Sequence, residues 1–445
     1  MVRSMRLTWL LVAICAALLI AAACGGDGDD GPTTTACPER TPGAAVEGTG
    51  EVLTKEAILA KDPSVTKCAE VVWGYMFERT GPLQGFGEPS GDGLLMAVQE
   101  INAAGGFQVG DTIYTIRLIE KDTRSDVAQA VALTTELVQD EGVKVLWGPA
   151  TIGDAESTEI TKAGDVLHLC PCPEREVTSL ATEEKAQNES PLVFQTLPAP
   201  SRFLPPGARQ LAKDRPEFRT FATICVNSSI GQSFCDFFRD AYVAAGFEHV
   251  GQETFPAGTV DFSPFLTSIK EQDPDIVLNF TDAGTAQFSL LNDAWELDVG
   301  DYHIAVALPY ELFEGLVGAG IRDKIVSAGA APRTHAQYTS EKSRAFFEET
   351  YKPFKGGTLP PAAFAALLTY DPAFMVIAAM QAAGTVDDPA RIAEALRGIH
   401  YNGVGEDDLF FEGRHVIVSG SDSCLATGGR YVECHHNPPP PLEND

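Results

Sequence analysis

Short apolar stretches alternate along most of the chain with longer amphipathic ones. The first series of apolar stretches, each the length of a buried strand, comprises residues 71–76, 112–120, 143–148, 166–170 and 193–197. Helical patterns such as 93–106 and 125–142 separate them, and Ser125 or Asp126 would cap the second helix. Strands and helices that alternate at this spacing predict a parallel sheet with helices on both faces.

The same alternation begins again near residue 220. Strand patterns occur at 220–226, 249–255, 275–280 and 302–308. Helical patterns lie between them at 230–246, 263–272 and 283–298. Residues 341–398 are mostly helical in pattern, with Pro389 suited to a first helical turn. Hairpins are expected near the end of the chain, the last of them around the turn between Cys424 and Cys434. The pattern therefore predicts two α/β lobes, which agrees with a chain too long for one hydrophobic core.

The first 24 residues are typical of an export signal. Arg3 and Arg6 precede an uncharged apolar run that ends in small residues at Cys24. This ending resembles a bacterial lipoprotein signal, so we expect removal of residues 1–23 and lipid on Cys24. An ordinary cleaved signal, with Cys24 incidental, is the alternative. Lipid on Cys24 would hold the protein on the outer face of the cytoplasmic membrane without spanning it, and no later apolar stretch is predicted to cross a bilayer.

The mature chain would be strongly acidic. Loss of the signal removes two arginines and no acidic residue, so the net charge moves from −30 to −32. Nucleic acids and anionic membrane surfaces require a basic footprint. The composition therefore excludes both as partners, and the membrane is reached through the lipid anchor only.

Disulfides are the default state of the cysteines in an exported protein. Eight of the ten remain when Cys15 and Cys24 are set aside, and eight cysteines allow on the order of a hundred pairings. We predict the pairs Cys37–Cys68, Cys225–Cys235 and Cys424–Cys434. Cys170 and Cys172 are left over, and a bridge between them would be near the limit of disulfide geometry.

Two segments before the main alternation differ in composition. Residues 24–68 are polar and rich in Gly, Thr and Pro at first, with a short helical pattern at 54–62, and are interpreted as a lipid-anchored linker with a disulfide clip. Residues 80–93 hold five glycines and two prolines and are expected to form a loop. They do not predict a dinucleotide site, because Ser90 stands where the third glycine of G-x-G-x-x-G belongs.

Several segments resemble, in order and spacing, the type 1 periplasmic solute-binding proteins, in the branched-chain amino-acid receptor branch of the ABC importers. They are TGPLQGFGEPSGDGLLMAVQEINAAGGF, VLWGPATIGDAES, PLVFQTLPAPS, VNSSIGQSFCDFF, PAGTVDFSPFLTSIKEQDPDIVLNF and TYDPAFMVIAAMQAAG. The resemblance implies two Rossmann-like lobes joined by a three-stranded hinge. It assigns residues 69–196 plus 330–397 to lobe 1, 198–328 plus 398–434 to lobe 2, and 435–445 to a polar Pro-rich tail.

The resemblance also implies a receptor without cofactor or catalytic residues. It would capture a small amino-acid-like or organic-acid ligand between the lobes and deliver it to the permease and ATPase subunits of an ABC importer. In the family, Phe86 would offer a ring face, Thr151 and its adjacent amides would hold a ligand carboxylate, and Asp282 would meet the ligand ammonium. Core packing of Phe86 and helix capping by Thr151 and Asp282 are the alternatives. Tyr310 and Glu311 would line the opening.

Two departures from the family make the predicted pocket less polar. Cys172 lies in CPCPE, where relatives carry Ser-Ala-Thr, and Ile230 precedes Gly231, where they carry Tyr-Gly. An aromatic acid, a short-chain amide or a urea-like compound is therefore expected beside branched-chain amino acids.

Other functions receive less support. His168, Cys170 and Cys172 would share one face of a strand and could suit zinc or copper, but Pro171 disturbs the strand and no fourth ligand is evident, so no metal is predicted. No G-x-S-x-G, H-E-x-x-H or P-loop occurs. A ligand-sensing subunit of a signalling protein and an exported hydrolase remain as alternatives to the transport receptor.

Overall fold

The computed structural model describes ten ranges of the chain. They are 51–172, 182–227, 229–281, 284–304, 317–328, 339–360, 362–413, 415–419, 421–427 and 430–437. Predictions for the signal segment, Cys24, Cys37, Asp282, Tyr310 and Glu311 lie outside these residues.

The first sheet has the strand order β3-β4-β2-β5-β6-β7. All neighbours are parallel except β3, which is antiparallel to β4. The strands are β2 (Lys67–Phe77), β3 (Phe107–Val109), β4 (Thr112–Asp122), β5 (Val145–Trp147), β6 (Leu167–Cys170) and β7 (Val193–Gln195). Between them run α2 (Gln84–Ala103), α3 (Val127–Thr135) with η1 (Glu136–Asp140), α4 (Asp154–Ala163) and α5 (Glu183–Glu189). Asp126 caps α3 through the amide of Gln129, as one of the two predicted caps.

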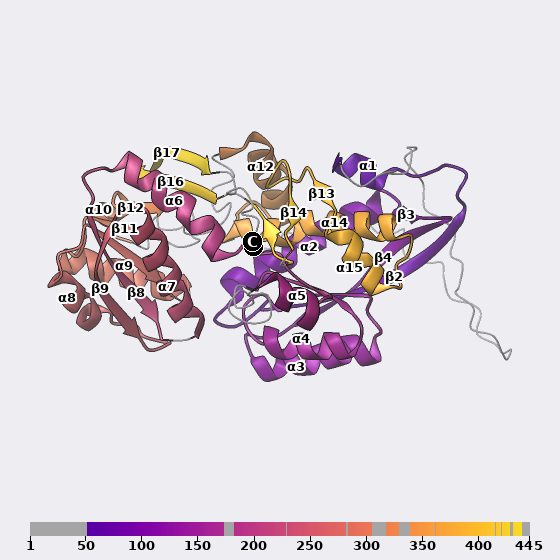
Figure 1. The fold of residues 1–445 in the computed structure, drawn as a ribbon, viewed down its shortest axis with the longest axis horizontal. Coiled ribbons are helices and arrows are strands. Elements are labelled where there is room, and N and C mark those ends of the chain that lie inside the picture. The colour runs from indigo at the N-terminus through magenta and orange to yellow at the C-terminus, as the bar shows by residue number, and fades with distance from the viewer. Residues whose placement is uncertain are drawn as a thin grey trace, which may run out of the picture. The chain divides into compact units, whose positions relative to one another are not determined.

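The second sheet has the order β17-β16-β12-β11-β10-β8-β9. Its strands are β8 (Thr220–Val226), β9 (Glu248–Phe255), β10 (Ile276–Phe280), β11 (Tyr302–Ile304), β12 (Ile325–Ala328), β16 (Ser421–Thr427) and β17 (Arg430–Asn437). Helices α6 (Pro200–Asp214), α7 (Ser229–Ala244), α8 (Ser263–Lys270), α9 (Gly284–Leu297) and α10 (Ala319–Arg322) accompany it (Figure 1). The β16-β17 hairpin is antiparallel and pairs with β12 through β16, also antiparallel. The other neighbours are parallel.

After β12 the chain returns to the first lobe. Helices α12 (Glu341–Ala345), η4 (Phe346–Tyr351), α13 (Lys352–Phe354), η5 (Ala363–Ala366), α14 (Leu367–Ala383) and α15 (Pro389–Leu396) follow, with the predicted Pro389 in the first turn and Asp388 as its cap. Short strands β13 (His400–Tyr401), β14 (Phe410–Phe411) and β15 (Ile417–Val418) come next, and β14 and β15 pair as an antiparallel hairpin.

Three predicted segment boundaries need correction. Tyr401, Phe411 and Ile417 belong to the hydrophobic core of the first lobe, so residues 399–418 pack there and only β16 and β17 return to the second sheet. Part of the predicted linker also belongs to the first lobe, because β1 (Val52–Leu53) pairs with β13 and Ile58, on α1 (Lys55–Leu59), is fully buried in the same core. Finally, β17 includes the first three residues of the predicted tail.

The predicted loop at residues 80–93 is also corrected, because α2 begins at Gln84 and most of this segment is helical. Each internal glycine weakens a helix, which is why the composition predicted a loop. Packing explains the difference. A Cβ on Gly87 would meet the backbone of Glu78, and a Cβ on Gly93 would meet the carbonyl oxygen of Ala366, so these glycines permit close approach of α2 to its neighbours.

Helix α14 forms the centre of the first lobe. With η5 it makes a 21-residue apolar stretch, Ala363–Ala383, that is long enough to cross a membrane by length and composition, contrary to the sequence-based expectation. The window is buried throughout, and α14 packs against α2 and α15 (Figure 1). Its apolar surface on all sides therefore serves as protein core.

Candidate functional site

The carboxyl ends of parallel strands bring four predicted or newly found site residues to one edge of the first sheet. Glu78 follows β2, Thr151 follows β5, Cys172 follows β6 and Thr196 follows β7. These strands are adjacent in the order β2-β5-β6-β7 and parallel, so their carboxyl ends lie at the same edge. In open α/β sheets this edge is where ligands bind.

Glu78 and Thr196 are the two residues of this edge that the sequence did not predict. The side chain of Glu78 is buried, and its carboxylate accepts three backbone hydrogen bonds: Oε2 from the amide of Ala150 at 3.1 Å, and Oε1 from those of Thr151 and Ile152 at 3.0 and 3.2 Å. Burial raises the pKa of the Glu78 carboxyl, and the bonds from the backbone amides act in the opposite direction. The available signal was an acidic residue directly after an apolar strand.

The contacts of Glu78 correct one part of the prediction for Thr151. The amides expected to hold a ligand carboxylate already bind a carboxylate of the protein itself. The cap residue of α4 is Gly153, so Thr151 is not the N-cap either. Thr151 Oγ1 is buried and has no hydrogen-bond partner among the described residues. The hydroxyl, rather than the amide, is therefore the group of Thr151 that remains available.

Phe86 lies on the first turn of α2 and is partly buried. Its ring centroid is 6.1 Å from that of Phe364, and it packs against a small apolar cluster with Leu197 and Leu368. Phe86 therefore takes part in core packing, which was the alternative to a role in ligand binding.

A pocket opens next to this cluster. It is lined by Thr196, Pro198, Phe364, Leu367, Leu368, Asp371, Gly405, Leu409, Ile417 and Ser419. Three of these residues, Thr196, Asp371 and Ser419, are buried and polar. Thr196 Oγ1 has no hydrogen-bond partner among the described residues, whereas the Asp371 carboxylate accepts the amides of Val404 and Gly405 at 2.9 and 2.8 Å.

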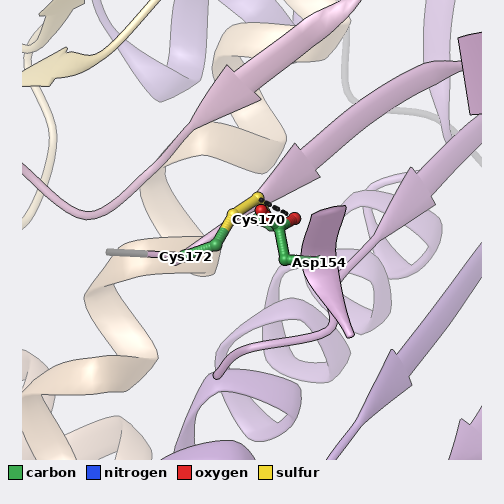
Figure 2. Close-up of side chains that lie close together, drawn as sticks. All are labelled: Asp154, Cys170 and Cys172. Carbon is green, nitrogen blue, oxygen red and sulfur yellow. Dashed lines mark hydrogen bonds between the residues drawn. A yellow bond between two sulfur atoms is a disulfide. The ribbon is translucent and has the colours of Figure 1, made fainter. Parts of the chain in front are cut away.

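Cys170 and Cys172 form a disulfide at the end of β6, with their Cα atoms 5.2 Å apart. Figure 2 shows the bridge beside the carboxyl group of Asp154, whose Oδ1 lies 3.3 Å from Cys170 Sγ. These three side chains are close enough together to hold a metal ion, but sulfur atoms in a disulfide are not the thiolates that bind metals.

His168 does not join this group, although the sequence placed it on the same strand face. Its Nε2 lies 2.7 Å from the carbonyl oxygen of Gly148 and its Nδ1 3.2 Å from Thr161 Oγ1, and the ring is buried. The ring is thus held by structural hydrogen bonds.

One of the predicted disulfides joins two elements of the second lobe. Cys225, at the end of β8, is bonded to Cys235 on α7. Cys68 and Cys434 are also disulfide-bonded, and Cys424 lies directly opposite Cys434 in the β16-β17 hairpin. Ile230 lies on the first turn of α7.

The fold and this edge agree with what comparison of the chain with known proteins shows. The chain matches the periplasmic binding protein family over residues 70–421, which is most of its length, and it belongs to that family. Proteins of this family are substrate-binding proteins rather than enzymes, and the family implies an extracytoplasmic location.

The similar sequences include two Leu/Ile/Val-binding protein homologs of Brucella abortus (strain 2308). Homolog 8 is 25% identical over 287 residues, which are 59% of this chain and 67% of the relative. Homolog 6 is 25% identical over 339 residues, or 76% and 83% of the two chains.

Solved structures show the same fold. The branched-chain amino-acid transporter substrate-binding protein LivJ from Streptococcus pneumoniae, in complex with isoleucine, matches with a TM-score of 0.66 at 21% identity and covers 83% of this chain and 100% of its own. An ABC transporter solute-binding protein from R. palustris, in complex with benzoate, matches with a TM-score of 0.67 at 19% identity, covering 84% and 98%. The predicted type 1 periplasmic-binding-protein fold is confirmed.

Proposed function

We propose that this protein is a lipid-anchored receptor that captures a small organic solute at the carboxyl edge of the first sheet and delivers it to an ABC importer. The observation that carries this proposal is the convergence of Thr151, Cys172 and Thr196 on that edge, with two buried hydroxyl oxygens that lack partners among the described residues. Buried polar atoms are rarely left without a hydrogen bond, and a bound solute would supply one.

The similar proteins support a small solute of modest polarity. Structural neighbours are described in complex with isoleucine, benzoate or hydroxybenzoates. The edge in this protein adds an apolar aromatic residue, Phe86, and a disulfide that offers no hydrogen-bond donor. Capture would follow from closure of the two lobes over the solute, because contacts from both lobes stabilise the closed form over the open one.

The experiment is a thermal-shift screen of amino acids, aromatic acids and amides, followed by calorimetry on the Thr151→Val variant. This change removes the hydroxyl without breaking a hydrogen bond among the described residues, so the melting temperature should be kept while affinity falls by about tenfold, the value of one polar contact. Thr267→Val, which removes an exposed hydroxyl on α8, is the matched control and should bind as the parent protein does.

Two results would count against the proposal. Equal affinity of the Thr151→Val variant and the parent protein would remove this edge from the site. An unchanged radius of gyration at ligand saturation, measured by small-angle scattering, would exclude capture by closure.

A further inference from the structure

We infer that Glu78 is a specificity-determining residue, and that the solute presents an uncharged polar group, such as a carboxamide, to the edge between β2 and β5. The inference rests on the proposed function, since it names the chemical class that the same site accepts. The observation behind the inference is that the Glu78 carboxylate itself occupies a position where backbone amides could bind an anion.

The amides of Ala150, Thr151 and Ile152 form such a position. Three successive N–H groups converge on one point just before α4, where the helix dipole also favours negative charge. An unoccupied set of this kind would attract a ligand carboxylate. Here the Glu78 carboxylate uses all three donors, and it reaches them from the neighbouring strand.

The charge of Glu78 is balanced by these amides rather than by a cation. No Lys or Arg in the described part of the chain pairs with Glu78, and the adjacent Arg79 instead binds Asp92 with a 2.9 Å contact. Lys355 binds Asp92 and Glu88. Among the described residues, the three amides and the nearby cations Arg79 and Lys355 are already engaged, so a ligand carboxylate placed here would face a buried charge of its own sign.

A cationic group finds no free hydrogen-bond partner in Glu78, because both oxygens of its buried carboxylate already accept backbone amides. The group left for the solute is the Thr151 hydroxyl, which both donates and accepts. A neutral carboxamide has a matching donor and acceptor and needs no countercharge.

The test uses sets of compounds with one shape and three charges. Benzoate, benzamide and benzylamine form one set, and isovalerate, isovaleramide and isoamylamine form the other. Calorimetry with the parent protein should show the amide binding at least about tenfold more tightly than the matched carboxylate and amine. Tighter binding of the carboxylate or the amine than of the amide would overturn the inference and leave the receptor function in place.

Substitution of Glu78 tests whether this residue causes the preference for the amide over the carboxylate. Glu78→Gln keeps the shape and an acceptor oxygen but removes the charge, so the preference of amide over carboxylate should fall by about tenfold. Asp122→Asn is the matched control, because Asp122 also accepts backbone amides, from Arg79, Thr80 and Arg124, at the end of the adjacent β4. An equal loss of preference in both variants, or in neither, would contradict the role of Glu78.

A third measurement does not depend on finding a solute. Glu78→Ala leaves the three amides without an acceptor, so acetate should raise the melting temperature of this variant and leave that of the parent protein unchanged. Absence of this rescue would show that the amides are not an anion position and would overturn the inference. If no compound bound the parent protein, the receptor proposal would fail, while acetate rescue would still decide whether Glu78 fills the position.

Discussion

Asp371 should make the protein less stable as the pH rises from about 4 to about 6. The side chain lies on α14 with 1% of its surface exposed, and its two oxygens accept the amides of Val404 and Gly405. Burial raises the pKa of Asp371 from 3.8 to about 6, although the two amides and the charges of Lys342 and Lys55 oppose that change. The perturbation that isolates this effect is Asp371→Asn, which has the same shape and no titrating proton.

The sign follows from the two pKa values. Between them the folded protein holds a proton on Asp371 that the unfolded chain has lost, so stability is greatest below the unfolded pKa and declines as pH rises through the folded pKa. A difference of about two pKa units corresponds to about 3 kcal/mol. His303 and His415, whose pKa values burial lowers to about 4, contribute in the opposite direction, because the unfolded chain takes up protons there first as the pH falls.

The assay is urea unfolding of the parent protein and the variant at a series of pH values. The histidine contributions are common to both proteins and cancel in the difference between their free energies of unfolding. That difference should change by about 3 kcal/mol from pH 4 to pH 7, in favour of the variant at the higher pH. Asp140→Asn, at an exposed position, is the control for the exchange of a carboxylate for an amide. A flat difference curve for Asp371→Asn, or a curve that the control reproduces, would refute the argument from burial.

Two further predictions concern the helix packing and the membrane anchor. Gly93→Ala should lower the free energy of unfolding by about 2 kcal/mol, because the new methyl group would overlap the carbonyl oxygen of Ala366, whereas Gly85→Ala, with nothing near its Cβ, should be neutral or stabilising; chemical denaturation tests both, and equal effects would be contrary to the packing argument. Cys24→Ala should abolish incorporation of labelled fatty acid and release the protein from the membrane fraction, and labelling that persists in this variant would rule out lipidation at Cys24.

The alternation of apolar and amphipathic stretches was sufficient to predict most strands of both sheets, but not β3 or β12. It worked because strands buried on both faces need continuous apolar runs, as in 71–76 and 220–226, which lie within β2 and β8. Residues 399–418 were assigned to the wrong lobe for the converse reason. Their strands are only two residues long, and tertiary contacts rather than a periodic pattern place them in the first core.

The candidate site was harder to predict, because its chemistry depends on contacts between residues far apart in sequence. Thr151 could be found from its place after a strand, but only the structure shows that its amide binds a residue 73 positions earlier. The bridge between Cys170 and Cys172 was left open for a similar reason. Sequence spacing limits the geometry of such a bridge, whereas the backbone after β6 brings the two Cα atoms to 5.2 Å.

The glycine-rich segment and Glu78 form one structural arrangement. Gly87 lies so close to Glu78 that a Cβ at this position would touch the Glu78 backbone, and this proximity lets the first turns of α2 cover the end of β2. The cover keeps the Glu78 carboxylate away from water. Among the described residues, backbone amides then stabilise the charge of this carboxylate. A larger residue at Gly87 would lift the helix, admit water and loosen the carboxylate from its amides. If Glu78 sets the solute preference as we propose, the glycines would act on it through the burial of Glu78, without any need to contact the solute themselves.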